Sequence, residues 1–103
     1  MMRVGSPQRL EEAKRRHADA VRALNSWEHV TRGSTWRNLI EVRHTFPSAD
    51  AVAVKSGNVV TIFNIRGNNY RLITGIDYPC GLVNVLLFLT HAEYDKESWK
   101  KKL

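Results

Sequence analysis

Three apolar, β-branched segments follow one another in the second half of the chain, separated only by short turns. They are Val59 to Ile65, Tyr70 to Ile76 and Leu82 to Leu89. Arg66-Gly67-Asn68-Asn69 separates the first two, and Gly and Asn tolerate the positive φ of a tight hairpin turn. Asp77 to Gly81 makes the second turn. The pattern therefore predicts an antiparallel meander of three strands, and it excludes folds that lack one.

Two further strands are expected beside the meander. Ala51 to Lys55 is a short apolar segment that ends at a Ser-Gly-Asn turn. Met2 to Val4 forms a brief opening strand, which Gly5-Ser6-Pro7 ends early. Leu82 to Leu89 is apolar on both faces, which is typical of an interior strand covered on at least one face by helices.

The region between these strands predicts helices. Ser6 is expected to be the N-cap and Pro7 the first residue of a helix, and Ala18-Asp19 either opens a second helix or bends the first. Gly33 is expected to end the helical region, because glycine is able to adopt positive φ. The apolar stripe of the second helical segment comprises Val21, Leu24, Trp27, and Val30 or Thr31.

A third, shorter helix is expected around Trp36 to His44, capped by Ser34 or Thr35. Its buried side would consist of Leu39, Ile40 and Val42. The order of strand, helices and meander predicts one α+β domain over residues 1–103. The N-terminal helices would pack on one face of a four- to five-stranded, mainly antiparallel sheet.

The charge and cysteine content narrow the functional classes. The net charge is +6, which favours a polyanionic partner, nucleic acid before an anionic membrane, or serves solubility alone. The single cysteine, Cys80, excludes a disulfide framework and a cysteine-based zinc site. The longest apolar run, Val85 to Leu89, is too short to span a bilayer, and no signal peptide is evident. We therefore expect a cytoplasmic protein that has no membrane partner.

Hairpin geometry predicts where the polar side chains meet. If both turns are tight, Arg71 lies opposite Asn64 in one neighbouring strand and opposite about Phe88 in the other. The turn at 66–69, Arg71 and the segment after the last strand then share one end of the sheet. Lys55 lies at the opposite end, so we exclude it from the site.

Six polar side chains are expected at this end: Arg66, Arg71, His91, Tyr94, Asp95 and Lys96. Arg71 can bind a phosphate with two hydrogen bonds and neutralise charge that grows at phosphorus. His91 suits proton transfer near neutral pH, and Asp95 can orient it or accept a proton itself. Tyr94 can stack on a base or donate a hydrogen bond. Without further acidic neighbours, these residues make a poor cage for a divalent metal.

Each of these residues also has a structural interpretation. Arg71 can instead pair with Asp77 or Glu93, and His91 can simply stabilise the strand end. Tyr94 can be a core aromatic that closes the sheet. The lysines from Lys100 onward form either a solvated tail or an arm that follows phosphates, while Trp27 and Trp36 are expected in the core. Residue chemistry alone favours an RNA-cleaving site without establishing one.

Two segments resemble a known family: Thr61 to Tyr78, TIFNIRGNNYRLITGIDY, and Leu89 to Lys96, LTHAEYDK. They are similar to the HigB-type toxins of bacterial type II toxin–antitoxin systems, within the RelE-like superfamily. The matching motifs are Phe63-Asn64-Ile65, Gly67-Asn68, Tyr70-Arg71-Leu72 and Thr90 through Lys96. The helical half agrees in layout, so the resemblance spans nearly the whole chain. The opening strand is shorter than in the family pattern, so it is in doubt whether this segment forms an edge strand of the sheet.

The resemblance implies an mRNA interferase, a ribosome-dependent endoribonuclease that uses neither metal nor cofactor. The 2′-OH of the substrate would attack the neighbouring phosphorus and leave a 2′,3′-cyclic phosphate. The implied partners are mRNA in the ribosomal A site and a helix-turn-helix antitoxin of the HigA type. Implied catalytic residues are Arg71, His91, Tyr94 and Asp95, and implied RNA-binding residues are Arg66, Asn69, Lys96 and Lys100. A non-catalytic RNA- or ribosome-binding module, or an inactive toxin that only binds its antitoxin in operon repression, remains the alternative.

Overall fold

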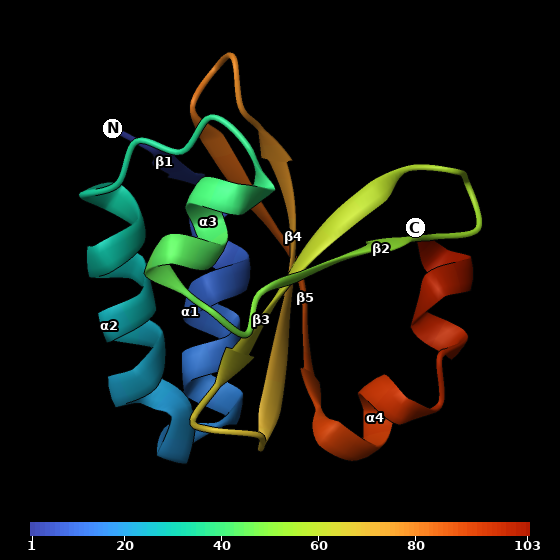
Figure 1. Ribbon diagram of the computed structural model, residues 1–103. Coiled ribbons are helices and arrows are strands. Elements are labelled where there is room, and N and C mark those ends of the chain that lie inside the picture. The colour runs from blue at the N-terminus through green and yellow to red at the C-terminus, as the bar shows by residue number, and fades with distance from the viewer.

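A five-stranded sheet with the order β1-β5-β4-β3-β2 divides the molecule, for which a computed structural model describes residues 1–103 (Figure 1). The strands are β1 (Arg3–Gly5), β2 (Asp50–Ala53), β3 (Val59–Ile65), β4 (Tyr70–Asp77) and β5 (Leu82–Thr90). β1 runs parallel to β5, and every other neighbouring pair is antiparallel. The predicted α+β class and mainly antiparallel sheet are confirmed. The opening strand is present as a short edge strand.

One extra residue in β5 changes the predicted register. Arg71 lies opposite Asn64, as expected, but opposite Leu89 rather than Phe88. The register shifts where Ile73 and Thr74 pair with β5, because Leu86 forms a bulge. Since paired residues share a face, the bulge places Leu89 on the face of Arg71 and moves Phe88 to the other.

The N-terminal helices cover one face of the sheet, as predicted (Figure 1). They are α1 (Pro7–Arg16), α2 (Val21–Arg32) and α3 (Leu39–Thr45), with a 3-10 turn at Ala18–Ala20 between the first two. Ala18 therefore begins a second helical segment and does not merely bend the first helix. Ser6 precedes α1 as predicted, but it has a φ of 57° and makes no side-chain capping bond. Pro7 alone marks this helix start.

The ends of the other helices differ from expectation in two places. Gly33 ends α2 as expected, but its φ of −83° shows that it does not use the positive φ open to glycine. α3 begins at Leu39 because the side chain of Asn38 accepts a hydrogen bond from the amide of Glu41. Ser34 and Thr35 are therefore not its cap, and the helix starts three residues later than predicted.

Burial of the helical stripes follows these boundaries. In α2, Thr31 is buried and Val30 is exposed, so Thr31 rather than Val30 is the fourth residue of the buried stripe. In α3, Val42 is buried but Ile40 is 67% exposed, so the predicted burial of Ile40 is wrong. Trp27 and Trp36 lie in the core beside Phe63, as expected.

The second face of the sheet has a core of its own. After α4 (His91–Asp95), the chain folds back over this face as a 3-10 helix, Ser98–Lys102 (Figure 1). Trp99 in that helix is only 3% exposed. It packs with four residues of the strands and their connecting turn: Val54, Val60, Ile62 and Ile73. Trp99 therefore anchors this segment, so the lysines from Lys100 to Lys102 belong to a packed 3-10 helix rather than to a free solvated tail.

We expect Trp99→Ala to lower the free energy of unfolding by about 3–5 kcal/mol, because it removes the largest side chain of this second core. The urea midpoint, followed by circular dichroism, measures the loss. Lys101→Ala is the matched control, since Lys101 is an exposed residue of the same 3-10 helix and should change stability by less than about 0.5 kcal/mol. Equal midpoints for the two variants would contradict this packing.

Candidate active site

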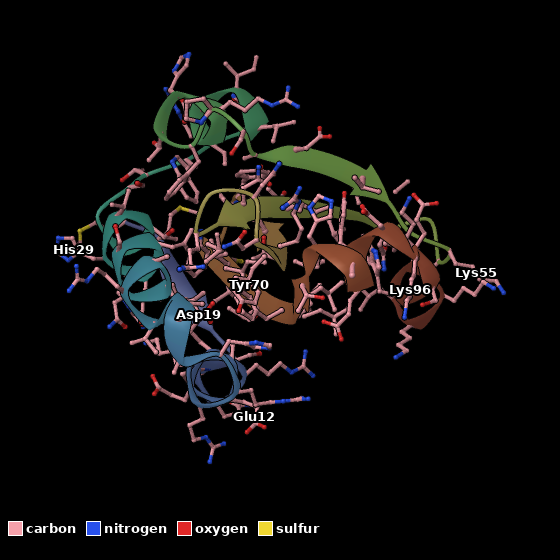
Figure 2. All side chains as sticks on the ribbon, turned by 90° about the horizontal axis from the view of Figure 1, so that it is seen from below. Glu12, Asp19, His29, Lys55, Tyr70 and Lys96 are labelled. Atoms are coloured by element: carbon pink, nitrogen blue, oxygen red, sulfur yellow. The ribbon has the colours of Figure 1, made fainter.

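The turn between β3 and β4 lies against the start of α4. The amide of His91 donates a hydrogen bond of 3.0 Å to the carbonyl of Asn69, and Tyr70 pairs with Thr90 across the sheet. These contacts bring the Arg66–Asn69 turn and the His91–Lys96 segment together at one end of the sheet. Figure 2 looks onto this end, where Tyr70 lies between the N-terminal helices and the α4 segment.

A capping box fixes the direction of α4. The side chain of Thr90 accepts a hydrogen bond from the amide of Glu93, and the carboxylate of Glu93 accepts one from the amide of Thr90. A helix of five residues has little stability of its own, so these bonds and its packing hold it in place. The box thereby positions His91, Tyr94 and Asp95, which all lie on this one turn.

Arg71 projects from β4 on the face opposite the helices, and its guanidinium is held in place. Nη1 donates to the carbonyls of Asn68 and Tyr70 at 3.1 and 3.2 Å, and Nη2 donates to Oδ1 of Asn68 at 2.9 Å. Its Cζ lies 5.3 Å from the ring centroid of Tyr94. No carboxylate neutralises this cation. It therefore remains available to an anion.

The alternative partners of Arg71 are engaged elsewhere. Asp77 accepts a hydrogen bond from the amide of Cys80, within the β4–β5 turn. Glu93 accepts the Thr90 amide in the capping box. The alternative in which Arg71 pairs with either carboxylate is therefore excluded.

His91 and Asp95, the first and last residues of α4, contact each other. Nε2 of His91 lies 3.0 Å from Oδ2 of Asp95, and Nδ1 lies 3.1 Å from the carbonyl of Asn68. Both ring nitrogens thus face oxygen acceptors, so a protonated ring satisfies both contacts and a neutral ring satisfies one. The side chains of His91 and Asp95 are 48% and 62% exposed, so a substrate can reach both.

Asn68 joins the two halves of the site, and the sequence reasoning did not select it. Its carbonyl accepts hydrogen bonds from both Arg71 and His91. The sequence did carry one signal for it: Asn68 lies in a turn three residues before Arg71, within reach of that side chain. Asn69, predicted to bind RNA, contributes its backbone carbonyl to His91, while its side chain makes no hydrogen bond within the chain.

Trp99 supports the site from the second core and was also missed. Its ring stacks on Tyr94 with centroids 5.4 Å apart, and its Nε1 donates to the Tyr94 carbonyl at 3.1 Å. Tyr94 therefore contacts both the core and Arg71, which combines the two interpretations that its sequence position allowed. The sequence did not indicate that Trp99 stacks on Tyr94. The two residues are five apart, and the chain between them is not a continuous helix, so no regular spacing relates them.

Arg66 reaches the same end of the sheet but turns toward the helices. Its Nη1 lies 3.4 Å from Asp19, and Asp19 also accepts a 2.7 Å hydrogen bond from the hydroxyl of Tyr70. That hydrogen bond raises the pKa of Tyr70 above its ordinary value. The Tyr70 ring stacks on Phe88 and meets His17 edge-on. Arg66 is thus separated from Arg71 by the sheet.

The predicted lysines divide between the two ends of the sheet. Lys96 is exposed at the C-cap of α4, directly after Asp95. The carbonyl of Lys100 accepts a hydrogen bond from the amide of Lys55, which places Lys100 at the end that we excluded. Its Nζ pairs with Glu97 and lies over the Trp99 ring. The structure therefore does not bring Lys100 to Arg71.

A family model described as HigB_toxin, the RelE-like toxic component of a toxin–antitoxin system, matches residues 20–97. The chain belongs to this HigB toxin family. It is also 30% identical to the mRNA interferase HigB of Escherichia coli O6:H1, over 92% of this chain and 90% of the relative. The HigB resemblance seen in the motifs is thus confirmed, and the fold described above is consistent with the RelE-like class. In this HigB-family chain, no helix has the length and apolar character needed to cross a bilayer.

The capping box predicts a pH-dependent stability. The hydrogen bond from the Thr90 amide lowers the pKa of Glu93, so the folded state favours the ionised carboxylate. Glu93→Gln keeps a neutral capping group, and it should reduce stability at about pH 7. That difference should disappear as the pH falls through the lowered pKa, because protonated Glu93 and Gln are then equivalent. Urea midpoints of both proteins, measured from about pH 7 downwards through the acid range, follow the difference, and a gap that does not shrink with falling pH would contradict it.

Proposed function

We propose that this chain is an mRNA interferase, an endoribonuclease that cleaves translated mRNA. The observation that carries the proposal is the convergence of an uncompensated Arg71 with the His91–Asp95 contact around the backbone of Asn68. Cleavage of a phosphodiester without a metal requires at least a cation that binds the phosphate and a nearby group that transfers protons. The name of the Escherichia coli relative supports the same activity.

The reaction that fits these groups is an internal transfer at phosphorus. The 2′-oxygen forms a bond to the adjacent phosphorus while the bond from phosphorus to the 5′-oxygen of the next nucleotide breaks. One proton leaves the 2′-OH and one arrives on the departing 5′-oxygen. The products are a 2′,3′-cyclic phosphate and a free 5′-OH.

Each side chain has a role in this scheme. Arg71 donates two hydrogen bonds to the non-bridging oxygens, whose negative charge grows in the transition state. His91 exchanges protons with the substrate, and Asp95 holds its ring in place. Tyr94 stacks on a base or donates a hydrogen bond from its hydroxyl. Lys96 and the side chain of Asn69, both exposed beside this group, contact the flanking RNA.

The open geometry favours a ribosome-bound substrate. His91 and Asp95 lie on an exposed one-turn helix, and nothing encloses a scissile phosphate between them and Arg71. Such a site gains orientation if the A site of the ribosome already holds the codon in one conformation. Membership of a toxin–antitoxin family implies an antitoxin partner. We further propose that this antitoxin is a helix-turn-helix protein of the HigA type, which binds this chain and blocks it.

Growth arrest and RNA cleavage should depend on Arg71 and His91. Expressed without an antitoxin, the wild type should stop bacterial growth, and primer extension should show discrete new 5′ ends in translated mRNA. Arg71→Ala should reduce the cleavage rate by roughly 10²–10³, the cost of deleting one transition-state donor, and His91→Ala should also cleave more slowly.

Arg22→Ala is the matched control, because Arg22 is an exposed arginine of α2 on the far side of the helices. It should arrest growth like the wild type. Arrest by Arg71→Ala and His91→Ala at wild-type strength would reject the catalytic proposal. Binding to ribosomes without new 5′ ends would support the non-catalytic alternative.

Ribosome dependence can be measured with purified components. The protein should cut an mRNA bound in programmed ribosomes at least about 10²-fold faster than the same RNA free in solution, because the A site supplies the orientation that the shallow site lacks. Cleavage fragments should carry a 2′,3′-cyclic phosphate, which mass spectrometry identifies. Equal rates on free and ribosome-bound RNA would reject the dependence while leaving the nuclease proposal intact.

A further inference from the structure

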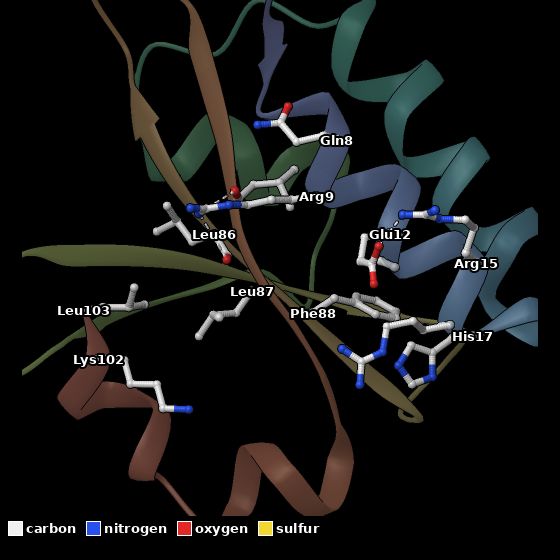
Figure 3. Close-up of a pocket in the computed structure, with 13 residues that line it drawn as sticks. Gln8, Arg9, Glu12, Arg15, His17, Leu86, Leu87, Phe88, Lys102 and Leu103 are labelled. Atoms are coloured by element: carbon white, nitrogen blue, oxygen red, sulfur yellow. Dashed lines mark hydrogen bonds and ion pairs between the residues drawn. The ribbon is translucent and has the colours of Figure 1, made fainter.

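A groove of about 710 Å³ runs between α1 and the second half of β5, and the proposed cleavage does not use it (Figure 3). Its floor is the β5 segment from Val85 to Phe88. One wall is the α1 face that carries Arg9, Glu12 and Arg16, and the other is the end of the chain at Lys102 and Leu103. The groove therefore lies along the edge of the sheet rather than above its middle.

The floor of this groove is an unpaired strand edge. β1 pairs only with Leu82 to Asn84, so the segment from Val85 to Thr90 pairs with β4 alone. This segment holds no charge and no proline, and Leu86 to Leu89 are only partly buried. Proteins usually protect such edges with charged residues, prolines or bulges, because an open edge pairs readily with another chain. Here the bulge at Leu86 is the only such device within the strand.

Arg9 covers the edge weakly. Its Nη1 lies 3.4 Å from the carbonyls of both Val85 and Leu86, as the dashed lines in Figure 3 mark. Both contacts are longer than a well-formed N–H···O bond of about 2.9–3.0 Å. Arg9 is exposed, so its side chain can leave these carbonyls when a stronger donor arrives.

The rim of the groove is positively charged. Four cationic side chains line it, namely Arg9, Arg15, Arg16 and Lys102, against one acidic side chain, that of Glu12. Glu12 already pairs with Arg15. The remaining three cations form no ion pair within the chain, although Arg16 is close enough to Glu93 to help lower the pKa of that carboxyl.

We propose that this edge binds an extended, acidic segment of a partner protein, which adds a strand to β5. The main chain of the segment would pair with Val85 to Leu89, and its acidic side chains would face the cations of the rim. A second copy of this chain is disfavoured, because it would bring the same cations together. RNA would contact the rim but could not pair with the strand edge. The ring of Phe88 also stacks on Tyr70 and meets His17 edge-on, so it offers a base little open surface.

The test uses a synthetic peptide of about ten residues that alternates glutamate with valine, added to the full chain. We expect saturable binding by calorimetry, and slower hydrogen exchange at the amides of Val85 to Leu89. The same peptide with N-methyl groups on its valines has the same charge but cannot pair with a strand. It should bind at least about ten-fold more weakly, as should the lysine–valine peptide.

The matched protein variant is Lys102→Glu, which reverses one exposed charge of the rim. It should weaken binding about five-fold and leave the urea midpoint unchanged. Failure of the glutamate peptide to bind, or equal binding of the N-methylated peptide, would overturn the proposal. So would a uridine oligonucleotide that displaces the peptide and protects the same amides. None of these outcomes depends on whether the chain cleaves RNA.

Discussion

The bulge at Leu86 determines which side chains of β5 meet which layer of the protein. Side chains alternate along a strand, so one extra residue exchanges the faces of every residue after it. Phe88 consequently joins Tyr70 beneath the helices, while Leu89 accompanies Arg71 on the other face. Without the bulge, an aromatic ring would stand opposite Arg71. The bulge thus keeps the aromatic cluster and the cationic site on separate faces.

This separation gives the two faces different tasks. The helical face holds the larger core, built around Trp27, Trp36 and Phe63, and supplies most of the buried apolar surface. The other face has a small core centred on Trp99, and the candidate site is attached to it through Tyr94. Substitutions in the first core should act mainly on stability. Those near Trp99 act on stability and on the geometry of Tyr94 together.

Local sequence signals were sufficient for the strands and for the proximity of several polar residues. β-branched segments and the Arg66–Asn69 turn placed β3 and β4 to within one residue, and the meander brought Arg71 to the start of α4. The misses have nonlocal or competing causes. Three nearby residues, Ser34, Thr35 and Asn38, could all cap α3. Asn38 is the cap because its side chain accepts the hydrogen bond from the Glu41 amide.

Other misses arose from contacts that no local pattern encodes. The burial of Trp99 depends on residues much earlier in the chain, from Val54 to Ile73, so the residues next to Trp99 in the sequence did not reveal it. The position of Lys100 follows from the same fold-back, which carries it to Lys55. A bulge inside a continuous apolar run also leaves no compositional trace, because Leu86 has apolar residues on both sides.

The oxygen that joins the candidate site belongs to the main chain of residue 68. Its contacts with Arg71 and His91 do not depend on which side chain that position carries; only the 2.9 Å bond from Arg71 to Oδ1 requires the asparagine. The position can therefore vary among related toxins while the anchoring oxygen stays in place. A search for invariant residues would then undervalue one of the most connected atoms of the site, and a substitution there would test only part of what the residue contributes.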